Sequence, residues 1–163
     1  MQDLIESPVT TDMIPVTIRS YADDDFPKIH RFEMADGHEP YRSAVFVRQM
    51  GIICQNTFLV ATLDKDQVGY TIGALIQKKP QEAWILRMGV REDQRRNGIG
   101  SILIAELLEV FRTLGVRTVR LTVSPWNVPA LGLYLKMAFE QESYHEAYFG
   151  KDEDRIVMVR EIG

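Results

Sequence analysis

A basic stretch broken by glycines near the middle of the chain has the residue types of an anion-binding loop. It reads Arg95-Arg96-Asn97-Gly98-Ile99-Gly100-Ser101 and joins an apolar run at 83–90 to an amphipathic run that continues to 111. Where a strand turns into a helix in this way, the first helical N–H groups are free and the helix dipole adds partial positive charge. Gly98 and Gly100 would let backbone approach a bulky polyphosphate. The loop therefore predicts a cofactor that carries a diphosphate.

Two common phosphate loops fit this stretch poorly. A P-loop ends in Gly-Lys-Ser/Thr, but no lysine follows Gly100. A dinucleotide loop has a third glycine where this chain has Leu103, and NAD is kept only as a minor alternative. The spacing Arg95-x-x-Gly98-x-Gly100 instead resembles the acyl-CoA loop of the GNAT superfamily of N-acyltransferases. An ordinary helix-start loop with surface arginines is the other alternative.

A second block strengthens this resemblance. After an apolar run at 116–123 come Asn127, Ala130, Leu133-Tyr134 and Phe139. In the GNAT superfamily the segment after the fifth strand carries Asn, then a helix with Ala and Leu-Tyr, then Phe. Two motifs in the right order, separated by one strand, are far more specific than either alone. The chain is identified as a member of this superfamily over roughly residues 15 to 162.

Hydrophobic periodicity and turn residues predict the elements that position these motifs. We expect 1–14 to be a mobile arm and 15–163 to be a single acetyltransferase domain. The predicted elements are strand 16–19, helices from about 26 and over 41–50, strands 57–62, 68–76 and 83–90, helix 99–114, strand 116–123, a helix after 127, and a closing hairpin of 143–148 with 155–160. Pro80 is expected to separate the third and fourth strands.

This order predicts an α+β fold that matches the GNAT order. It is a central mixed, mostly antiparallel twisted sheet of about seven strands with flanking helices, and the resemblance implies a splay between strands 4 and 5. Ala138 departs from the family, which usually has glycine just before Phe139. If the helix ends there in a left-handed cap, the alanine costs about 1 kcal/mol.

Composition excludes several classes of function. The net charge of −4 argues against general binding of nucleic acid or anionic membranes. No apolar run is long enough to span a bilayer and the N-terminus lacks the pattern of a signal peptide, so a cytoplasmic location is expected. The single cysteine, Cys54, is interpreted as a small buried hydrophobe. His30, His38 and His145 lack metal-ligand spacing, so no metal is expected. Family members are often dimers, and a homodimer stays open.

The resemblance implies that an amine attacks the thioester of acetyl-CoA directly, and that a thiolate leaves. Tyr134 is the predicted proton donor to that thiolate, with a half-buried core aromatic as the alternative. The Val90 N–H is the predicted donor to the thioester oxygen, and Gly89 is expected to form a bulge or to be a packing glycine. Asn127 is predicted to contact the pantetheine arm and is also well suited to be a helix N-cap, and the two roles can coexist. The full set of predicted cofactor contacts is Met88, Gly89, Val90, Arg95, Arg96, Asn97, Gly98, Ile99, Gly100, Ser101 and Asn127.

The general base is where the chain departs from the family. Two familiar positions for a catalytic base are occupied by Trp84 and Thr122, neither of which can take a proton near neutral pH. Glu82, two residues before Trp84 and roughly 6–7 Å away on the same strand face, is the best carboxylate candidate. The alternative is that Glu82 is an ordinary solvated charge at the end of a strand. His38 and Glu39 are further candidates, and a water chain or no dedicated base at all remain open.

The acceptor is expected between the first two helices and the final hairpin. That wall is acidic and aromatic, which suits a cationic amine. Its predicted residues are Glu33, Asp36, His38, Glu39, Tyr41, Tyr144, Glu146 and Tyr148. The runs 84–100 and 148–158 resemble protein N-terminal acetyltransferases, so a peptide or protein amine is favoured. Small amines (polyamines, amino acids or aminoglycosides) and a CoA-binding module without catalysis stay as alternatives.

Overall fold

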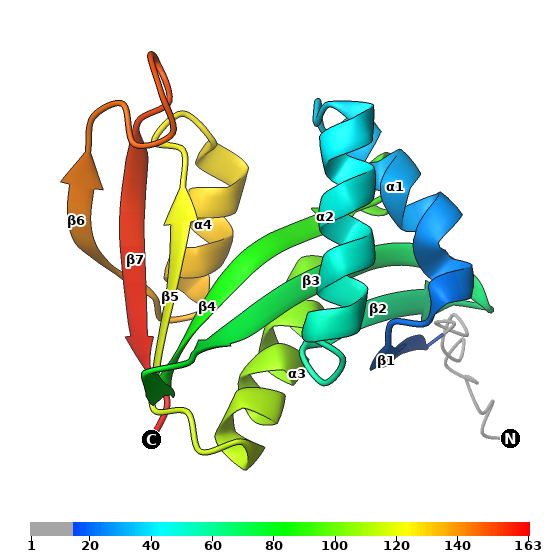
Figure 1. Cartoon of the computed structure of the whole chain (residues 1–163), viewed down its shortest axis with the longest axis horizontal. Helices are drawn as coiled ribbons and strands as arrows, with labels where there is room; N and C mark the ends of the chain where they lie inside the picture. Colours follow the sequence, from blue (N-terminus) through cyan, green and yellow to red (C-terminus); the bar gives the residue numbers. More distant parts are fainter. Residues whose placement is uncertain (1–14) are drawn as a thin grey trace, which may run out of the picture.

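The computed structural model describes residues 15–163, so the predicted arm at 1–14 lies outside the described part of the chain. The elements are β1 (Val16–Ser20), α1 (Phe26–Ala35), α2 (Pro40–Ile53), β2 (Phe58–Leu63), β3 (Asp66–Ile76), β4 (Lys79–Val90), α3 (Ile99–Thr113), β5 (Thr118–Val123), α4 (Val128–Lys136), β6 (Glu140–His145) and β7 (Arg155–Glu161), with short 3-10 turns at Asp23–Asp25 and Glu92–Gln94. The strands form one sheet in the order β1-β2-β3-β4-β5-β7-β6 (Figure 1). This confirms the predicted α+β fold.

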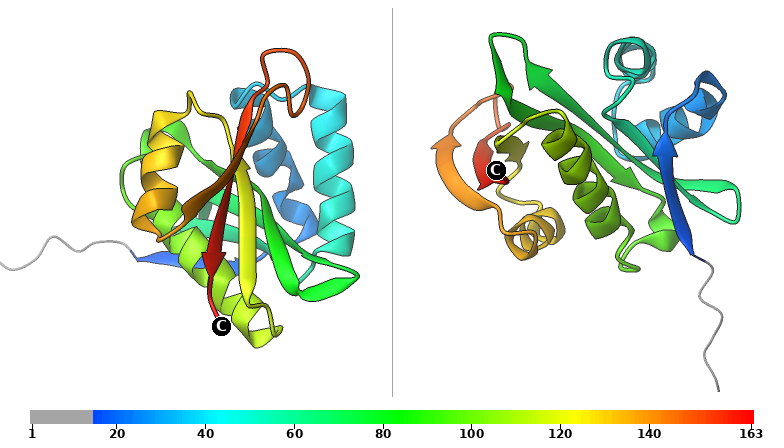
Figure 2. Two further views of the ribbon diagram at one scale, coloured as in Figure 1. Left: turned by 90° about the vertical axis from the view of Figure 1, so that its left-hand side faces the viewer. Right: turned by 90° about the horizontal axis from the view of Figure 1, so that it is seen from below.

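Helices cover both faces of the sheet. α1 and α2 lie on one face, and α3 and α4 lie on the other (Figure 2). β5 alternates buried and half-buried residues, and α3 buries a stripe with helical periodicity, so each presents one apolar side to the core. The core on the α3 side includes Leu103, Leu107, Phe111, Val119, Leu121, Val123, Tyr134 and Phe139. The core on the α1 side includes Ile29, Val47, Phe58, Val60, Tyr70 and Ile72.

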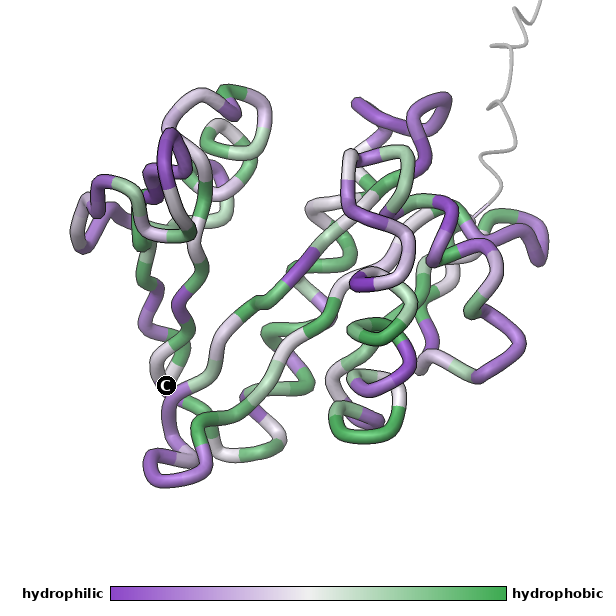
Figure 3. Tube along the Cα trace, turned by 45° about the horizontal axis from the view of Figure 1, so that its top comes forward, coloured by the Kyte–Doolittle hydropathy of each residue, from purple (hydrophilic) through white to green (hydrophobic). Residues whose placement is uncertain are grey.

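β4 and β5 are neighbours over only part of their length. Their parallel pairing begins at Glu82 and ends at Ile85, opposite Leu121. Beyond that point β4 pairs with β3 as far as Val90, and β5 continues along β7 as far as Val123. The sheet therefore divides into two arms, which separate visibly in Figures 1 and 3. The splay predicted between the fourth and fifth strands is confirmed.

Three helices end in the same backbone turn. Gly37, Gly115 and Ala138 follow α1, α3 and α4 with φ angles of 89°, 84° and 62°. In each case the next N–H donates to the carbonyl five residues back, at 2.9–3.0 Å. This is the Schellman motif, which satisfies carbonyls that the helix leaves without partners. The left-handed conformation expected at Ala138 is confirmed. Of the three turns, only this one has a residue with a Cβ in the left-handed position, and that Cβ strains the backbone.

Two predicted boundaries are wrong. Pro80 lies inside β4 rather than before it, because the register with β3 shifts between Leu75 and Ile76 and an irregular stretch of ladder tolerates a residue without N–H. β6 begins at Glu140, directly after the turn that ends α4, and finishes at His145 instead of 148. The start of β6 could not be recognised from the sequence, because β6 is a polar edge strand whose side chains are almost all exposed.

Candidate active site

A cleft of about 1190 Å³ opens where β4 and β5 diverge. α3 and α4 line it on one face of the sheet, and Asp36, His38 and Arg155 line it on the other. Of the predicted cofactor contacts it is lined by Met88, Gly89, Val90, Arg95, Arg96, Gly98, Ile99, Gly100, Ser101 and Asn127. Asn97 is not among its lining residues, and its side-chain amide donates to Gln94 Oε1 at 3.3 Å.

The first turn of α3 presents free N–H groups to this cleft. The N-cap Gly98 has a φ of 77° and no side chain to cap the helix. The first intrahelical bond runs from the Ile102 N–H to the Gly98 carbonyl at 3.1 Å, so the N–H groups of 99–101 have no helical partner. A Cβ on Gly100 would lie 3.2 Å from Leu133, so glycine keeps the space between α3 and α4 open. A helix start of this kind is an anion site.

The bulge expected at Gly89 lies elsewhere in β4. The register with β3 shifts between Ile72 and Gly73, which leaves Leu86 as the extra residue. Gly89 is in regular register opposite Tyr70, and a Cβ there would lie 2.5 Å from the Tyr70 ring. The interpretation of Gly89 as a bulge is therefore wrong. Glycine is needed at this position to make room for Tyr70.

The backbone of Val90 offers its amide to the gap between the strands. The Arg91 N–H donates to the Val68 carbonyl of β3 at 2.8 Å. Successive amides of a strand point to opposite sides, so the Val90 N–H faces away from β3. The parallel ladder has already ended at Ile85, and β5 is therefore not paired with this amide. A fixed donor in a cleft suits an oxygen that gains negative charge during reaction.

Asn127 lines the cleft from the N-cap of α4, and Tyr134 lines it from the last turn of the same helix. The Asn127 Oδ1 accepts a hydrogen bond from the Ala130 N–H at 3.2 Å, so Asn127 is the N-cap of this helix. The Tyr134 ring packs edge-on against Phe139, with centroids 6.0 Å apart. Burial raises the pKa of Tyr134 to about 12, so its hydroxyl stays protonated at neutral pH and can donate. Its role toward the thiolate stays a prediction.

Arg95 links the end of α1 to β4 through two hydrogen bonds. Its Nη2 lies 2.9 Å from Asp36 Oδ1 at the end of α1, and its Nε donates to the Val90 carbonyl at 3.0 Å. Arg96 has a φ of 68° and is exposed along the cleft. Of the two arginines, Arg96 is thus the better placed to reach a diphosphate.

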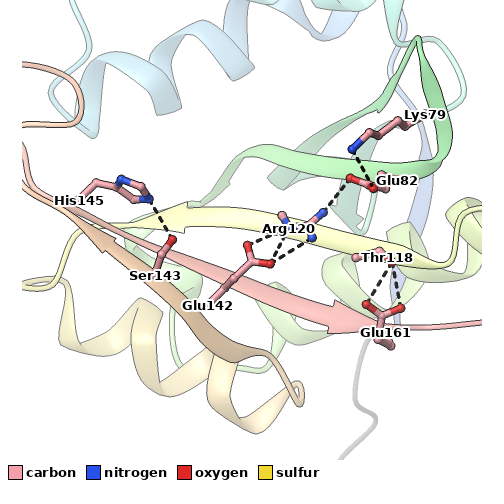
Figure 4. A network of polar contacts seen from close by, with 8 residues as sticks. All are labelled: Lys79, Glu82, Thr118, Arg120, Glu142, Ser143, His145 and Glu161. Atoms are coloured by element: carbon pink, nitrogen blue, oxygen red, sulfur yellow. Dashed lines mark hydrogen bonds and ion pairs between the residues drawn. The ribbon is translucent and has the colours of Figure 1, made fainter.

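Glu82, the predicted base, is held in a polar network beside the paired part of β4 and β5. Its carboxylate lies 2.8 Å from Arg120 Nη1 and 3.7 Å from Lys79 Nζ (Figure 4). Arg120 also hydrogen-bonds Glu142 of β6 at 2.9 Å, which raises the pKa of Arg120 and lowers the pKa of Glu142. Glu82 is not among the lining residues of the cleft. Its position gives it a structural ion pair and offers no support for the expected role as base.

The predicted acceptor residues fall in different places. His38 lines the cleft, whereas Glu33 is fully buried beneath it. Glu39 is the N-cap of α2, where its carboxylate accepts the N–H groups of Tyr41 and Arg42 at 3.0 and 2.9 Å. These two hydrogen bonds lower the pKa of Glu39. Glu39 is therefore occupied as a cap and is poorly suited to take a proton.

Aromatic side chains stand on the two elements that flank the acceptor side. Tyr41 of α2 is 75% exposed, and Phe149 of the β6–β7 connection is 63% exposed. The Tyr148 ring packs edge-on against Phe149 with centroids 4.8 Å apart, and Arg155 lies over the other end of this cluster at 4.9 Å from the Phe149 ring. The Tyr144 hydroxyl donates to Asp154 at 2.6 Å, which ties the two ends of the connection together.

Sequence reasoning missed two residues on the acceptor side of the cleft, Arg87 and Tyr70. The Arg87 Nη1 lies 2.5 Å from Oε1 of the buried Glu33. Tyr70 is 1% exposed, and burial, followed by the charge of Glu33, raises its pKa. A lone charge inside the apolar run 83–90 is a pattern that could have indicated Arg87. Nothing in the strand pattern distinguishes Tyr70 from an ordinary core aromatic.

The comparison with known proteins agrees with this geometry. A profile of the Acetyltransferase (GNAT) family matches residues 17–139. The chain belongs to the GNAT acetyltransferase family. Like other GNAT acetyltransferases, it uses acetyl-CoA and transfers its acyl group to an amine. The α3 N-terminus, the Val90 amide and Asn127 fit this cosubstrate, because they offer donors to its diphosphate, its thioester and its pantetheine arm.

Individual relatives of this GNAT enzyme act on different amines. An N-alpha-acetyltransferase of Saccharolobus solfataricus is 25% identical, over 90% of this chain and 93% of its own. A [Ribosomal protein bS18]-alanine N-acetyltransferase of Salmonella typhimurium is 26% identical, over 90% and 97%. The crystal structure of Ard1 from Thermoplasma volcanium has a TM-score of 0.81 and 27% identity, over 91% and 98%. Diaminobutyrate acetyltransferase EctA from Paenibacillus lautus, solved with its substrate and coenzyme A, shares the fold at a TM-score of 0.74 and 21% identity, over 92% and 99%.

Three further properties concern residues 15–163 only. Within this range, no helix is both long and apolar enough to cross a membrane. No group of three or more His, Cys, Asp or Glu residues in the same range could hold a metal ion. Cys54 is buried, and burial raises the pKa of its thiol, in keeping with a packing role.

Proposed function

We propose that this enzyme acetylates the free amino group at the start of a peptide or protein chain. The observation that carries the proposal is that aromatic side chains are exposed on either side of the acceptor face, Tyr41 on α2 and Phe149 on the β6–β7 connection. Figure 1 shows α2 and the β6–β7 connection on the two separate arms of the sheet. Aromatic rings exposed to this degree suit an extended chain that continues beyond the reacting amine. The similarity over nine-tenths of the chain to an N-alpha-acetyltransferase supports the same acceptor class.

In this proposal, residues on one face of the sheet hold acetyl-CoA, and the amine approaches from the other face. The α3 N-terminus and Arg96 hold the diphosphate, and Asn127 holds the pantetheine arm. Acetyl-CoA supplies the activated acetyl group. The Val90 N–H donates to the thioester oxygen as it gains charge, and the protonated Tyr134 hydroxyl donates to the sulfur. The amine enters from the other face, past His38 and Asp36.

Thiol release from acetyl-CoA with an acceptor panel tests this proposal. The panel holds short peptides with free amino termini, the same peptides blocked at the amino terminus but carrying lysine, spermidine and 2,4-diaminobutyrate. The proposal expects the highest kcat/KM with a free peptide amino terminus. Faster acetylation of a small diamine would contradict the acceptor class alone. A wild-type enzyme that acetylates no amine but binds acetyl-CoA would instead favour a module without catalysis.

A substitution on α2 adds a second test with an internal control. Tyr41→Ala should raise KM for the best peptide about 10-fold and leave KM for spermidine unchanged, because only a chain that extends past the amine reaches this ring. Ile52→Ala is the matched control, since Ile52 is 71% exposed at the far end of the same helix. Equal effects of Tyr41→Ala on peptide and spermidine would overturn the assignment of α2 as a peptide contact.

A further inference from the structure

The turn that ends α1 places a histidine over a buried carboxylate. Gly37 is left-handed, the Gly37 N–H donates to the Met34 carbonyl at 3.0 Å, and the His38 N–H donates to the Glu33 carbonyl at 3.0 Å. In this Schellman motif the residue after the glycine folds back onto the third residue from the helix end. The His38 Nε2 consequently lies 3.1 Å from Oε2 of Glu33.

The two other Schellman turns show what normally occupies these positions. At the end of α3 the pair is Phe111 with Val116, and at the end of α4 it is Tyr134 with Phe139. All four side chains are buried in the core on the α3 side, as the hydrophobic contact of this motif requires. Only α1 of these three helices puts two ionisable groups there. Because Glu33 and His38 contribute no apolar packing at this position, the pair is a candidate for a chemical role.

Glu33 is buried, and a hydrogen bond holds only one of its two carboxylate oxygens. Its side chain is 0% exposed, and its Oε1 is 2.5 Å from Arg87 Nη1. The second oxygen, Oε2, has no well-aligned hydrogen bond among residues 15–163, although His38 stands at ion-pair distance from it. A buried carboxylate oxygen without a donor is unfavourable. A protonated imidazole at this position would supply that donor to Oε2.

His38 also lies on the side of the cleft by which the amine enters in the proposed function. It is 40% exposed and lines the cleft, on the face opposite α3 and α4. Asp36, two residues earlier, is joined through Arg95 to the carbonyl of Val90, which places this end of α1 beside the expected thioester. Glu33 is the charged group at ion-pair distance from the imidazole, and the charged residues that line the cleft with His38 are Asp36, Arg87, Arg95, Arg96, Lys136 and Arg155.

We propose that His38 is the general base of the reaction and that Glu33 is its positioning residue. The neutral imidazole removes one proton from the incoming ammonium group, which leaves a neutral amine and an imidazolium paired with Glu33. The amine lone pair forms the C–N bond, and the C–S bond breaks with its electron pair on sulfur. Tyr134 gives its hydroxyl proton to the thiolate and recovers the proton that the new amide nitrogen sheds, and His38 returns its proton to solvent. The other candidates are engaged elsewhere, Glu82 in ion pairs and Glu39 in a helix cap.

Two variants with a matched control test His38. The acceptor is the fastest amine of the panel above, so the test needs acetyl transfer but not a particular acceptor class. His38→Ala and His38→Gln should lower kcat about 10²- to 10⁴-fold, with the acetyl-CoA stabilisation of the fold unchanged. Added imidazole should restore part of the His38→Ala rate. His30→Gln, in α1 before this turn and outside the cleft lining, should keep wild-type turnover.

The outcomes separate this inference from the proposed function. Wild-type kcat in both His38 variants, an effect confined to KM, or no response to imidazole would overturn the role of His38. An enzyme that acetylates no amine of the panel would overturn both. Methoxylamine, which is largely unprotonated at neutral pH and needs little base, should react with the His38→Ala variant at close to its wild-type rate.

A double-mutant cycle tests whether Glu33 acts through His38. Glu33→Gln should lower kcat about 10-fold in the wild-type background and have little further effect in His38→Ala. A merely structural role would give the same factor in both backgrounds, and that result would overturn the positioning role. Acetyl-CoA binding by each variant shows that its fold is intact.

Discussion

Ile85 and Leu121 are the last residues that pair β4 with β5, and the residues proposed for the chemistry lie just beyond them. Past this pair Val90 lines one cleft from β4, and Asn127 and Tyr134 line it from the two ends of α4. Two strands that remained paired would use the Val90 N–H in a ladder bond. Their separation leaves that donor unpaired by β5, as the proposed contact to a thioester oxygen and the proposed approach of the amine from the opposite face require.

Loss of the Tyr134 hydroxyl should slow the reaction while leaving the fold intact. Tyr134→Phe keeps the ring against Phe139, so only the proposed donor to sulfur is lost. We expect kcat to fall by ~10- to ~10³-fold with the best amine of the panel. Thiol release at saturating acetyl-CoA measures it. Turnover equal to wild type would show that sulfur takes its proton from another source.

Stability should fall in alkali because two tyrosines are buried. Burial raises the pKa of Tyr134 from 10.0 to about 12 and also raises that of Tyr70. The unfolded chain loses these protons first, so the stability is fully present below about pH 10 and is lost as pH rises toward the folded pKa. Tyr134 alone should account for roughly 3 kcal/mol across this range. Urea unfolding at several pH values should show a shallower alkaline decline in Tyr134→Phe, and an identical decline would refute the assignment.

A methyl group at Gly89 should disturb the fold at the site itself. The new Cβ would lie 2.5 Å from the buried Tyr70 ring, which has no space to retreat. Gly89→Ala should therefore lower the free energy of unfolding by about 1–3 kcal/mol. Gly132→Ala is the comparison, because nothing lies within 4 Å of its Cβ and alanine favours the α4 helix by about 1 kcal/mol. Opposite signs are expected in urea unfolding, and a neutral Gly89→Ala would contradict the packing argument.

Ala138→Gly should stabilise the protein. Ala138 has a φ of 62°, where a Cβ causes steric strain and glycine does not. The expected gain is about 0.5–1 kcal/mol, since glycine also adds entropy to the unfolded chain. Urea unfolding measures the change without reference to activity. A loss of stability would mean that the turn after α4 is held by something other than the Schellman bonds.

The order of the elements and the cofactor loop could be predicted from the sequence because both depend on local pattern. Helical and strand periodicities identify α3 and β5, and the glycines at 98 and 100 mark a helix start. The left-handed turn at Ala138 was equally local. The cleft itself follows from the family motifs, which name the residues on both of its walls.

The errors arose where a residue's role depends on register or on distant partners. The bulge falls at Leu86 because of how β3 aligns with β4, and Gly89 alone carries no information on that alignment. Glu82 has no partner in the local pattern, because Arg120, which pairs with it, lies 38 positions further along the chain on β5. The pair of Glu33 and Arg87 joins residues 54 positions apart, which no local pattern connects.

The central claim is that acetyl-CoA binds at the start of α3. Glycines at the two ends of this helix allow a matched test, since Gly98 and Gly115 have φ angles of 77° and 84° and open space around them. The measurement is the thermal midpoint with and without acetyl-CoA for wild type, Gly98→Asp and Gly115→Asp. At 100 times its Kd acetyl-CoA should stabilise wild type and Gly115→Asp by about 2.7 kcal/mol, but Gly98→Asp far less, because its carboxylate repels the diphosphate. An equal shift in Gly98→Asp, or no shift in wild type, would contradict the account.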